Sequence, residues 1–348
     1  MLIVEKTLSP EVDLSPDHIL RSVFEAALQA VDPMNVVPDF LPSAPKGRTV
    51  VVGAGKAAAR MAQAVERHWN GPLSGVVVTR YNHGAACRSI KVIEAGHPVP
   101  DGAGITATNE ILEAVQGLGA DDLVICLISG GGSALLTKPA PGISIEEKRD
   151  INRALLHCGA PIDEMNCVRR HLSVIKGGGL AAACGPAKIV TLIISDVPGD
   201  DPSVVASGPT VRDDSTRSDA LAILERYKIS MPDSVRTHLT SSSKVETRTD
   251  SRNEVHVIAT AQKALEAAAQ KAIELGLNPL ILGDRIEGEA RDVGKVHAGI
   301  ALQILNHDQP IRRPALLLSG GETTVTVRNP KGRGGRNQEF LLSLAVAL

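Results

Sequence analysis

Three strand-like apolar runs in this sequence end in glycine-rich loops that also carry a cation, hydroxyls or an acid. The first loop, residues 52–58, reads V-G-A-G-K-A-A and places Lys56 beside Gly53 and Gly55. Glycines between a strand and a helix let the backbone approach a phosphate, whose charge is met by the helix N-terminus. The loop also fits the loose dinucleotide fingerprint G-x-G-x-x-A, with Arg80 at the end of the next apolar run. A plain strand-to-helix turn is the alternative, but a lysine inside the loop favours contact with a phosphate.

The second and third loops offer backbone N–H groups and an acid. The second carries three glycines between two hydroxyls: Ser129, Gly130, Gly131, Gly132 and Ser133. Such a run leaves the N–H groups open to an anion, although a flexible hinge would use the same residues. The third, residues 319–324, reads S-G-G-E-T-T and contains Gly320, Gly321 and Glu322. Its carboxylate could hold a metal-bound water, bind a ribose hydroxyl or cap a helix. We predict that residues of all three loops bind a nucleotide cofactor.

Two further segments combine basic residues with glycines. Residues 331–339 read K-G-R-G-G-R-N-Q-E and lead into an apolar helix, which places Arg336 and Asn337 at its start. Arginine offers a planar fork that suits phosphate or carboxylate oxygens. Lys176 opens the run K-G-G-G after a helical stretch at 166–175 that carries Arg169 and His171. We predict that Asn337 binds the cofactor, and that Arg169, His171 and Lys176 bind an acidic substrate; solvated surface charge is the alternative for part of the set.

One acidic segment carries charge opposite to that of these basic and amide-rich loops. Residues 195–202 read S-D-V-P-G-D-D-P and follow directly on an apolar run that ends at Ile194. Asp196 therefore lies at the carboxyl end of a predicted strand, where the active sites of α/β sheets gather. We predict that it binds a metal ion or accepts a proton. Asp200 and Asp201 lie in a Pro/Gly turn, where aspartate is common for structural reasons.

These groups together favour phosphoryl transfer over the other reaction classes considered. That reaction needs positioning and neutralised charge, and it needs no strong nucleophile. An NAD(P)H-dependent reductase would explain the first loop but would leave the triple-glycine loop and Arg336 without a role. The histidines lack H-x-x-x-H or H-x-H spacing, and no G-x-S-x-G is present, which disfavours metal-dependent hydrolysis and serine hydrolysis. A non-catalytic binding module would not require cations and an acid at strand ends.

The elements that must position these groups alternate between strands and helices. Continuous apolar runs at 49–52, 75–79, 122–128 and 188–194 suit strands that are covered on both faces, as in parallel sheets. An amphipathic helix is predicted at 57–69, and Ser144 with Glu147 predicts a capping box that opens another. The pattern predicts an α/β fold with an N-terminal Rossmann-like parallel sheet and helices on both of its faces.

A polar stretch divides the chain into two predicted domains. Thirteen of the fourteen residues at 241–254 are polar or charged. We therefore predict an N-terminal domain at 1–240, a linker at 241–254 and a smaller α/β domain at 255–348. Strands are predicted at 256–259, 279–282 and 315–318, and helices at 261–275 and toward the end of the chain. The last helix is apolar up to Leu348, so we expect the second domain to be incomplete.

Composition limits the classes of partner and the compartment. The 348 residues carry a net charge of −2, with 37 lysines and arginines against 39 acidic residues, which argues against nucleic acid or an anionic membrane as the main partner. Aromatic residues make up only 2%, too few for base-stacking surfaces. The five cysteines form no C-x-x-C pair, and no leader or bilayer-spanning apolar run is visible. We expect a cytoplasmic enzyme with small-molecule substrates; a homo-oligomer is compatible with the sequence.

At these motifs the sequence resembles the glycerate 2-kinase family, whose C-terminal half is the MOFRL domain. The matching stretches cover essentially the whole chain: residues 52–58, 96–101, 127–136, 166–180, 194–208 and 318–342. They include I-S-G-G-G-S-A-L-L, S-D-V-P-G-D-D-P-S-V-V-A-S-G and G-G-R-N-Q-E. Any one motif alone would be weak, but their combination is highly specific.

The resemblance implies ATP-dependent phosphorylation of D-glycerate at its 2-hydroxyl, giving 2-phosphoglycerate, with Mg²⁺. Lys56 and Arg336 match the family's phosphate-handling lysine and arginine. Asp196 matches the aspartate of the family's S-D-V motif, for which we expect a metal or base role. The active site is expected in the cleft between the two domains. Similar sequences have also been described as hydroxypyruvate reductases, the counterpart of the NAD(P)H alternative.

Overall fold

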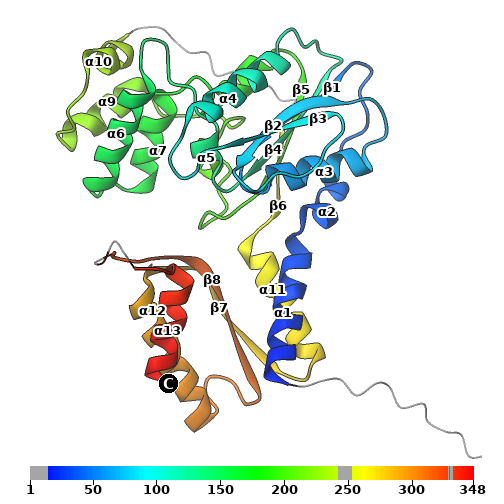
Figure 1. Cartoon of the computed structure of the whole chain (residues 1–348), viewed down its shortest axis with the longest axis vertical. Helices are drawn as coiled ribbons and strands as arrows, with labels where there is room; N and C mark the ends of the chain where they lie inside the picture. The colour runs from blue at the N-terminus through cyan, green and yellow to red at the C-terminus, as the bar shows by residue number, and fades with distance from the viewer. Residues whose placement is uncertain (1–14, 242–252, 328, 330–331) are drawn as a thin grey trace, which may run out of the picture. The chain divides into compact units, whose positions relative to one another are not determined.

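The computed structural model describes residues 15–241, 253–327, 329 and 332–348, and it divides into two compact units (Figure 1). The larger unit, the sheet unit, comprises Asp32–Thr260. The other, the terminal unit, joins the described residues up to Val31 with Ala261–Leu348. Residues 242–252 of the predicted linker lie outside the described residues.

A six-stranded parallel sheet forms the centre of the sheet unit. Its strand order is β3-β2-β1-β4-β5-β6. The strands are β1 (Thr49–Ala54), β2 (Ser74–Arg80), β3 (Ile90–Ala95), β4 (Leu123–Ser129), β5 (Lys188–Ile194) and β6 (Asn253–Ala259). This is the strand order of Rossmann folds, in which ligands bind at the carboxyl edge where the order reverses, here between β1 and β4. The predicted parallel sheet is confirmed.

Apolar side chains cover both faces of this sheet. Strands β1 and β4 are buried along their whole length. Helix α3 (Ala58–His68) buries Met61 and Val65 on one face, while α4 (Gly102–Ala114) buries Ala107 and Ile111 in a separate cluster on the other. The predicted continuous apolar runs are therefore explained by burial on two sides, and the predicted α/β fold is confirmed.

Strand β3 escaped the sequence analysis because charged residues interrupt its apolar pattern at the sheet edge. Glu66 on α3 anchors its start. The Glu66 carboxylate accepts hydrogen bonds of 2.6–3.0 Å from the backbone N–H groups of Arg88, Ser89 and Ile90. Burial raises the pKa of Glu66, but these donors and the Arg88 charge outweigh it, so the net pKa lies below its ordinary value.

Glu66→Ala should lower the free energy of unfolding by about 1–3 kcal/mol, because three backbone donors lose their acceptor. The lowered pKa means that this contribution is present above the ordinary glutamate pKa and is lost as pH falls through the folded-state value. Urea unfolding at pH 7 and at pH 3 checks both points. Glu113→Ala, at an exposed site on α4, is the control; equal losses for the two variants would contradict the anchoring role.

A helical cluster flanks the sheet in this unit. It is built from α6 (Ile145–His157), α7 (Ile162–His171), α9 (Arg217–Arg226) and α10 (Asp233–Thr240), which bury a common apolar core. The predicted capping box is confirmed: Ser144 Oγ accepts from the Glu147 amide, and the Glu147 carboxylate accepts from the Ser144 amide. The helical stretch predicted at 166–175 ends early, at His171, because the following residues turn back to pair Ser173 with Pro139.

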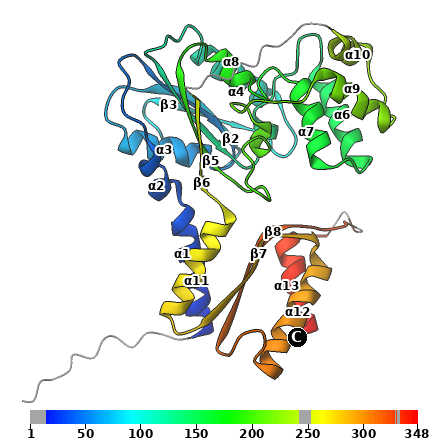
Figure 2. The same ribbon diagram turned by 180° about the vertical axis from the view of Figure 1, so that it is seen from behind.

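The terminal unit is built around the parallel pair β7 (Asn278–Glu289) and β8 (Ala315–Thr324). Helices α1 (Pro16–Val31) and α11 (Ala261–Glu274) pack together on one side of the pair, and α12 (Ala290–His307) and α13 (Arg336–Ala347) lie on the other (Figure 2). Val23 of α1 is buried against Ala268 and Ala272 of α11. No helix among the described residues is long and apolar enough to cross a membrane.

The structure differs from the sequence analysis at three places. Residues 319–324, predicted as a glycine loop, belong to β8, because Gly321 lies so close to β7 that an added Cβ would meet Ile286 O at 2.1 Å. The strand predicted at 256–259 pairs with β5 in the six-stranded sheet. Helix α1 groups with the C-terminal elements through its amphipathic face. The division into two compact units is a separate observation, and the domain boundaries predicted from the sequence at 240 and 255 stay a prediction.

Candidate active site

The first glycine loop connects β1 to α3, and its backbone is already hydrogen-bonded within the protein. The Gly55 amide donates to Val78 O, and the Lys56 amide donates to Gly130 O at 2.8 Å. The Ala57 amide donates to Ser129 Oγ at 3.0 Å. Gly53 lies inside β1, where an added Cβ would meet Leu127 O at 2.2 Å. What this loop offers a ligand is therefore the Lys56 side chain rather than its amides.

The second loop follows β4 and has the opposite character. Its four amides, from Gly130 to Ser133, donate no hydrogen bond to any acceptor among the described residues. Gly131 adopts the left-handed conformation, with φ of 84°, and precedes the short helix α5 (Gly132–Leu135). Successive unpaired N–H groups in a glycine turn form an anion-binding concavity. This loop, rather than the first, has backbone donors to spare.

Lys56 and Asp196 meet at the carboxyl edge of the sheet. Lys56 Nζ donates to Asp196 Oδ2 at 2.9 Å, and the two side chains are 41% and 42% exposed. Asp196 follows β5, and its carboxylate lies against Gly130: an added Cβ there would meet Asp196 Oδ2 at 1.8 Å. The pair, the open loop and the reversal of strand order therefore coincide, as expected for a ligand site in this fold.

His97 is a neighbour of this pair that the sequence analysis missed as a site residue. It follows β3, and its Nε2 lies within 2.9 Å of where a Gly131 Cβ would stand; the Lys56 side chain approaches the same position. Burial, together with the charges of Lys56 and Arg80, holds the pKa of His97 below its ordinary value, although Asp196 opposes the shift. The shift favours the neutral form of the ring. The signal available in the sequence was the place of His97 in the matching stretch 96–101, since the strand β3 before it was not predicted.

A second constellation lies in the terminal unit. Gly321, Glu322, Arg336 and Asn337 all line one cavity of about 450 Å³. Arg336 forms an ion pair with Glu322, and it also donates to Thr323 O at 3.3 Å. The structure thus brings together four residues that the sequence placed in two separate motifs. Their predicted contact with a nucleotide stays a prediction.

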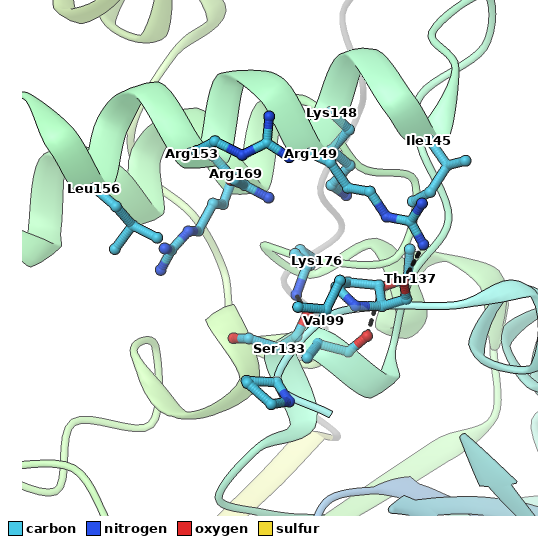
Figure 3. Close-up of a pocket in the computed structure, with 14 residues that line it drawn as sticks. Val99, Ser133, Thr137, Ile145, Lys148, Arg149, Arg153, Leu156, Arg169 and Lys176 are labelled. Atoms are coloured by element: carbon cyan, nitrogen blue, oxygen red, sulfur yellow. Dashed lines mark hydrogen bonds between the residues drawn. The ribbon is translucent and has the colours of Figure 1, made fainter. Parts of the chain in front are cut away.

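The three predicted substrate residues divide between two places. Arg169 and Lys176 line a cavity of about 320 Å³ in the sheet unit (Figure 3). His171 does not line it; its Nε2 lies 3.1 Å from Ser215 Oγ and 3.5 Å from Asp213 Oδ2. Sequence reasoning missed three further cations of this cavity, Lys148, Arg149 and Arg153, which stand on one helix in the pattern K-R-x-x-x-R.

Comparisons with known proteins agree with these motifs. A family model described as "Domain of unknown function (DUF4147)" matches residues 19–240, and the MOFRL family model matches residues 315–348. A protein of Agrobacterium vitis named "Putative hydroxypyruvate reductase" is 54% identical over 97% of this chain and 77% of its own length. The D-glycerate 2-kinase of Thermotoga maritima is 42% identical over 94% of this chain and 78% of its own.

A solved structure extends the agreement to three dimensions. The crystal structure of a glycerate kinase from Thermotoga maritima superimposes with a TM-score of 0.85, at 41% identity, over 95% of this chain and 79% of that one. Both the sequence relatives and the fold therefore lead to the same group of enzymes. The chain belongs to the glycerate 2-kinase family, and it is a kinase.

Proposed function

We propose that the protein transfers the γ-phosphoryl group of ATP to the 2-hydroxyl of D-glycerate, giving 2-phosphoglycerate and ADP, in a Mg²⁺-dependent reaction. The observation that carries the proposal is the contact between Lys56 and Asp196 beside the unpaired amides of the triple-glycine loop. Relatives named as glycerate 2-kinases and glycerate kinases support the substrate. We propose the carboxyl edge of the six-stranded sheet as the place of reaction.

Each member of the Lys56 constellation has a role that its chemistry supports. The Lys56 ammonium neutralises charge on the transferred phosphoryl group, while the amides of residues 130–133 bind its oxygens. Asp196 accepts the proton of the attacking alcohol or binds the metal ion. A fixed cation and fixed N–H groups need no reorganisation as charge develops, which is why such groups lower the barrier.

The donor set fits Mg²⁺ in the manner usual for phosphoryl transfer. Mg²⁺ is commonly held by one or two carboxylates together with substrate phosphates and water. Asp196 supplies one half-exposed carboxylate, and within the described ranges no group of three or more histidine, cysteine or acidic residues is placed to hold a metal ion. When bound with the nucleotide, the ion would screen phosphate charge. The residues present therefore suit a metal that arrives with ATP rather than a dedicated protein cage.

We propose that the cavity of the terminal unit, taken by itself, binds phosphate groups of a nucleotide. Arg336 offers a planar guanidinium to phosphate oxygens, and Asn337 an amide to the same ligand. Glu322 holds Arg336 in place through their ion pair until a phosphate competes for it. This arrangement also supports Glu322 as a group that binds a ribose hydroxyl or a water on the metal ion.

Asp196→Asn should separate the metal role from the base role. If Asp196 holds Mg²⁺, the Mg²⁺ concentration for half-maximal activity rises severalfold, and excess Mg²⁺ restores much of the rate. If Asp196 is the base, the rate falls by about 10²–10⁴-fold at every Mg²⁺ concentration. ADP formation measured over a Mg²⁺ titration distinguishes these outcomes. An unchanged rate at all concentrations would remove Asp196 from the mechanism.

The kinase and reductase alternatives separate in one pair of assays. ADP formation is followed with D-glycerate and Mg-ATP, and NADPH oxidation is followed with hydroxypyruvate. We expect ADP only when D-glycerate is present, and no NADPH consumption. The paired amides of the first loop support this expectation, because a dinucleotide pyrophosphate would need those donors. NADPH consumption without ATP turnover would overturn the proposed function.

A further inference from the structure

The cavity of the sheet unit that contains Arg169 and Lys176 is lined by an unusual excess of positive charge; we call it the basic cavity. Helix α6 forms one wall, and Lys176, Ser133 and Val99 lie on the facing wall (Figure 3). Five of its lining residues are cations: Lys148, Arg149, Arg153, Arg169 and Lys176. None of its lining residues in the described part of the chain is acidic.

Four of these five cations have no carboxylate partner. Among the described residues, Arg153 alone of the set forms an ion pair, with Asp150 at the surface. Lys176 Nζ donates to two neutral carbonyls, Ser133 O at 2.8 Å and Ala206 O at 3.5 Å. Lys148 is 4% exposed, and its Nζ has no hydrogen-bond partner at all in the described structure. Buried cations ordinarily have a charged or hydrogen-bonding partner. The basic cavity therefore lacks an anion that would pair with its lysines and arginines.

Burial and the charges of the neighbouring cations lower the pKa values of the buried cations in this cavity. Burial, with the charge of Arg169, lowers the pKa of Lys148 to about 7. Burial, with the charges of Lys148 and Arg169, lowers the pKa of Lys176 well below its ordinary value. Burial also lowers the pKa of Arg169. Like charges this close destabilise one another until an anion lies between them.

The basic cavity adjoins the triple-glycine loop but is separate from the Lys56–Asp196 contact. Ser133 ends the loop and lines the basic cavity, whereas Gly130, at the other end, touches Asp196. Likewise His97 touches the loop on the Lys56 side, and Pro98 lines the basic cavity. A small molecule in the basic cavity therefore lies one loop away from the phosphoryl-handling groups.

We infer that the basic cavity binds the carboxylate of a small hydroxy acid through Lys148, Arg169 and Lys176. The inference rests on the proposed function in one respect only, that D-glycerate is the acid used as probe. It assigns the contact to Lys148 in addition to Arg169 and Lys176, and it gives Arg149 and Arg153, which line the same cavity, the role of further positive charges around the carboxylate. None of these three residues of α6 lies in a motif. A carboxylate accepts several hydrogen bonds at once and supplies the missing negative charge.

Binding of an acid should draw protons into the basic cavity. The charged groups that line the basic cavity together with Lys148 are Arg149, Arg153, Arg169 and Lys176, all of which are basic. Of these, Arg169 and Lys176 interact electrostatically with Lys148. An anion favours the charged form of Lys148 and raises its pKa, so above pH 7 binding must be accompanied by proton uptake. Affinity for D-glycerate should therefore fall as pH rises from about 7 to 9.

Calorimetric titration of the whole chain with D-glycerate, without nucleotide, tests the inference. The wild type should bind D-glycerate and not glycerol, which lacks the carboxylate. Lys148→Met should raise the dissociation constant at least about tenfold, since a charged hydrogen bond is lost. The same change should raise the melting temperature by about 2 °C or more, because an unpartnered buried amine is replaced by an apolar side chain. Lys91→Met, on the outer strand β3, should change neither value.

The opposed changes in affinity and melting temperature exclude a purely structural role for Lys148, which would lower the melting temperature. If Lys148→Met does not fold, Arg153→Gln, at an exposed position, becomes the deciding variant. Its affinity for D-glycerate should be about two- to fivefold weaker than that of the wild type. Wild-type affinity in both variants would overturn the inference, as would binding of inorganic phosphate but not D-glycerate. Cavity-dependent binding of D-glycerate without ADP formation would overturn the proposed function and leave the inference standing.

Discussion

Lys56→Met should lower the turnover number with D-glycerate and ATP at least about a hundredfold, the scale of losing one preorganised charge aimed at transition-state oxygens. Methionine keeps most of the side-chain stem, so the packing around the loop is preserved. The Lys56 backbone is held independently of the side chain by its amide bond to Gly130 O. We therefore expect an unchanged far-ultraviolet circular dichroism spectrum and a lost rate.

The matched control is Lys91→Met, which removes an exposed lysine of β3 that is paired with Glu110 of α4. Surface pairs of this kind contribute about 0–1 kcal/mol, so its rate should stay within twofold of wild type. Single-turnover measurement of ADP formation reports the chemical step directly. Activity of Lys56→Met within twofold of wild type would remove Lys56 from the mechanism.

Gly130→Ala should cost about as much, for a steric reason. The new methyl group would stand 1.8 Å from Asp196 Oδ2 and 2.1 Å from Asp196 Cγ, so the carboxylate must leave its place against the loop. Because Asp196 and Lys56 share a 2.9 Å contact, the shift breaks the pair that carries the proposed function. Displacement of a reacting group by about 1 Å costs on the order of a hundredfold in rate.

Gly102→Ala is the control for this change. Gly102 begins α4, and an added Cβ there meets nothing within 4 Å. Its turnover number and melting temperature should equal those of the wild type or slightly exceed them. A crystal structure of Gly130→Ala should show Asp196 turned away from Lys56. Full activity in Gly130→Ala would mean that Asp196 need not occupy this position during the reaction.

Local patterns in the sequence predict much of the fold. The apolar runs that became β1, β4 and β5 were legible because a strand buried on both faces leaves no room for polar residues. The capping box at Ser144 could be predicted from the sequence because its hydrogen bonds join residues three positions apart. Edge strand β3 could not be recognised, since its exposed position accepts Lys91 and its half-buried position accepts Glu94, and both charges break the pattern.

The third glycine segment shows a limit of motif reasoning. A run of two glycines after an apolar strand predicts a loop, but residues 319–324 continue β8. What decides is the neighbouring strand: Ile286 of β7 approaches Gly321 so closely that no side chain fits between them. Gly321 is needed here because it allows a close backbone contact. The local sequence does not show which strand makes that contact.

For the site, the sequence by itself determined the residue types that end each strand: a lysine after β1, unshielded amides after β4 and an aspartate after β5. Because parallel strands share one carboxyl edge, these were expected to gather. Only the tertiary structure decided that Lys56 and Asp196, 140 residues apart, are in direct contact. Only it decided that Lys148 is buried, because a charged residue on a helix is solvated or enclosed according to which face its neighbours cover. For Lys148 of α6 those neighbours include Arg169 of α7 and Lys176.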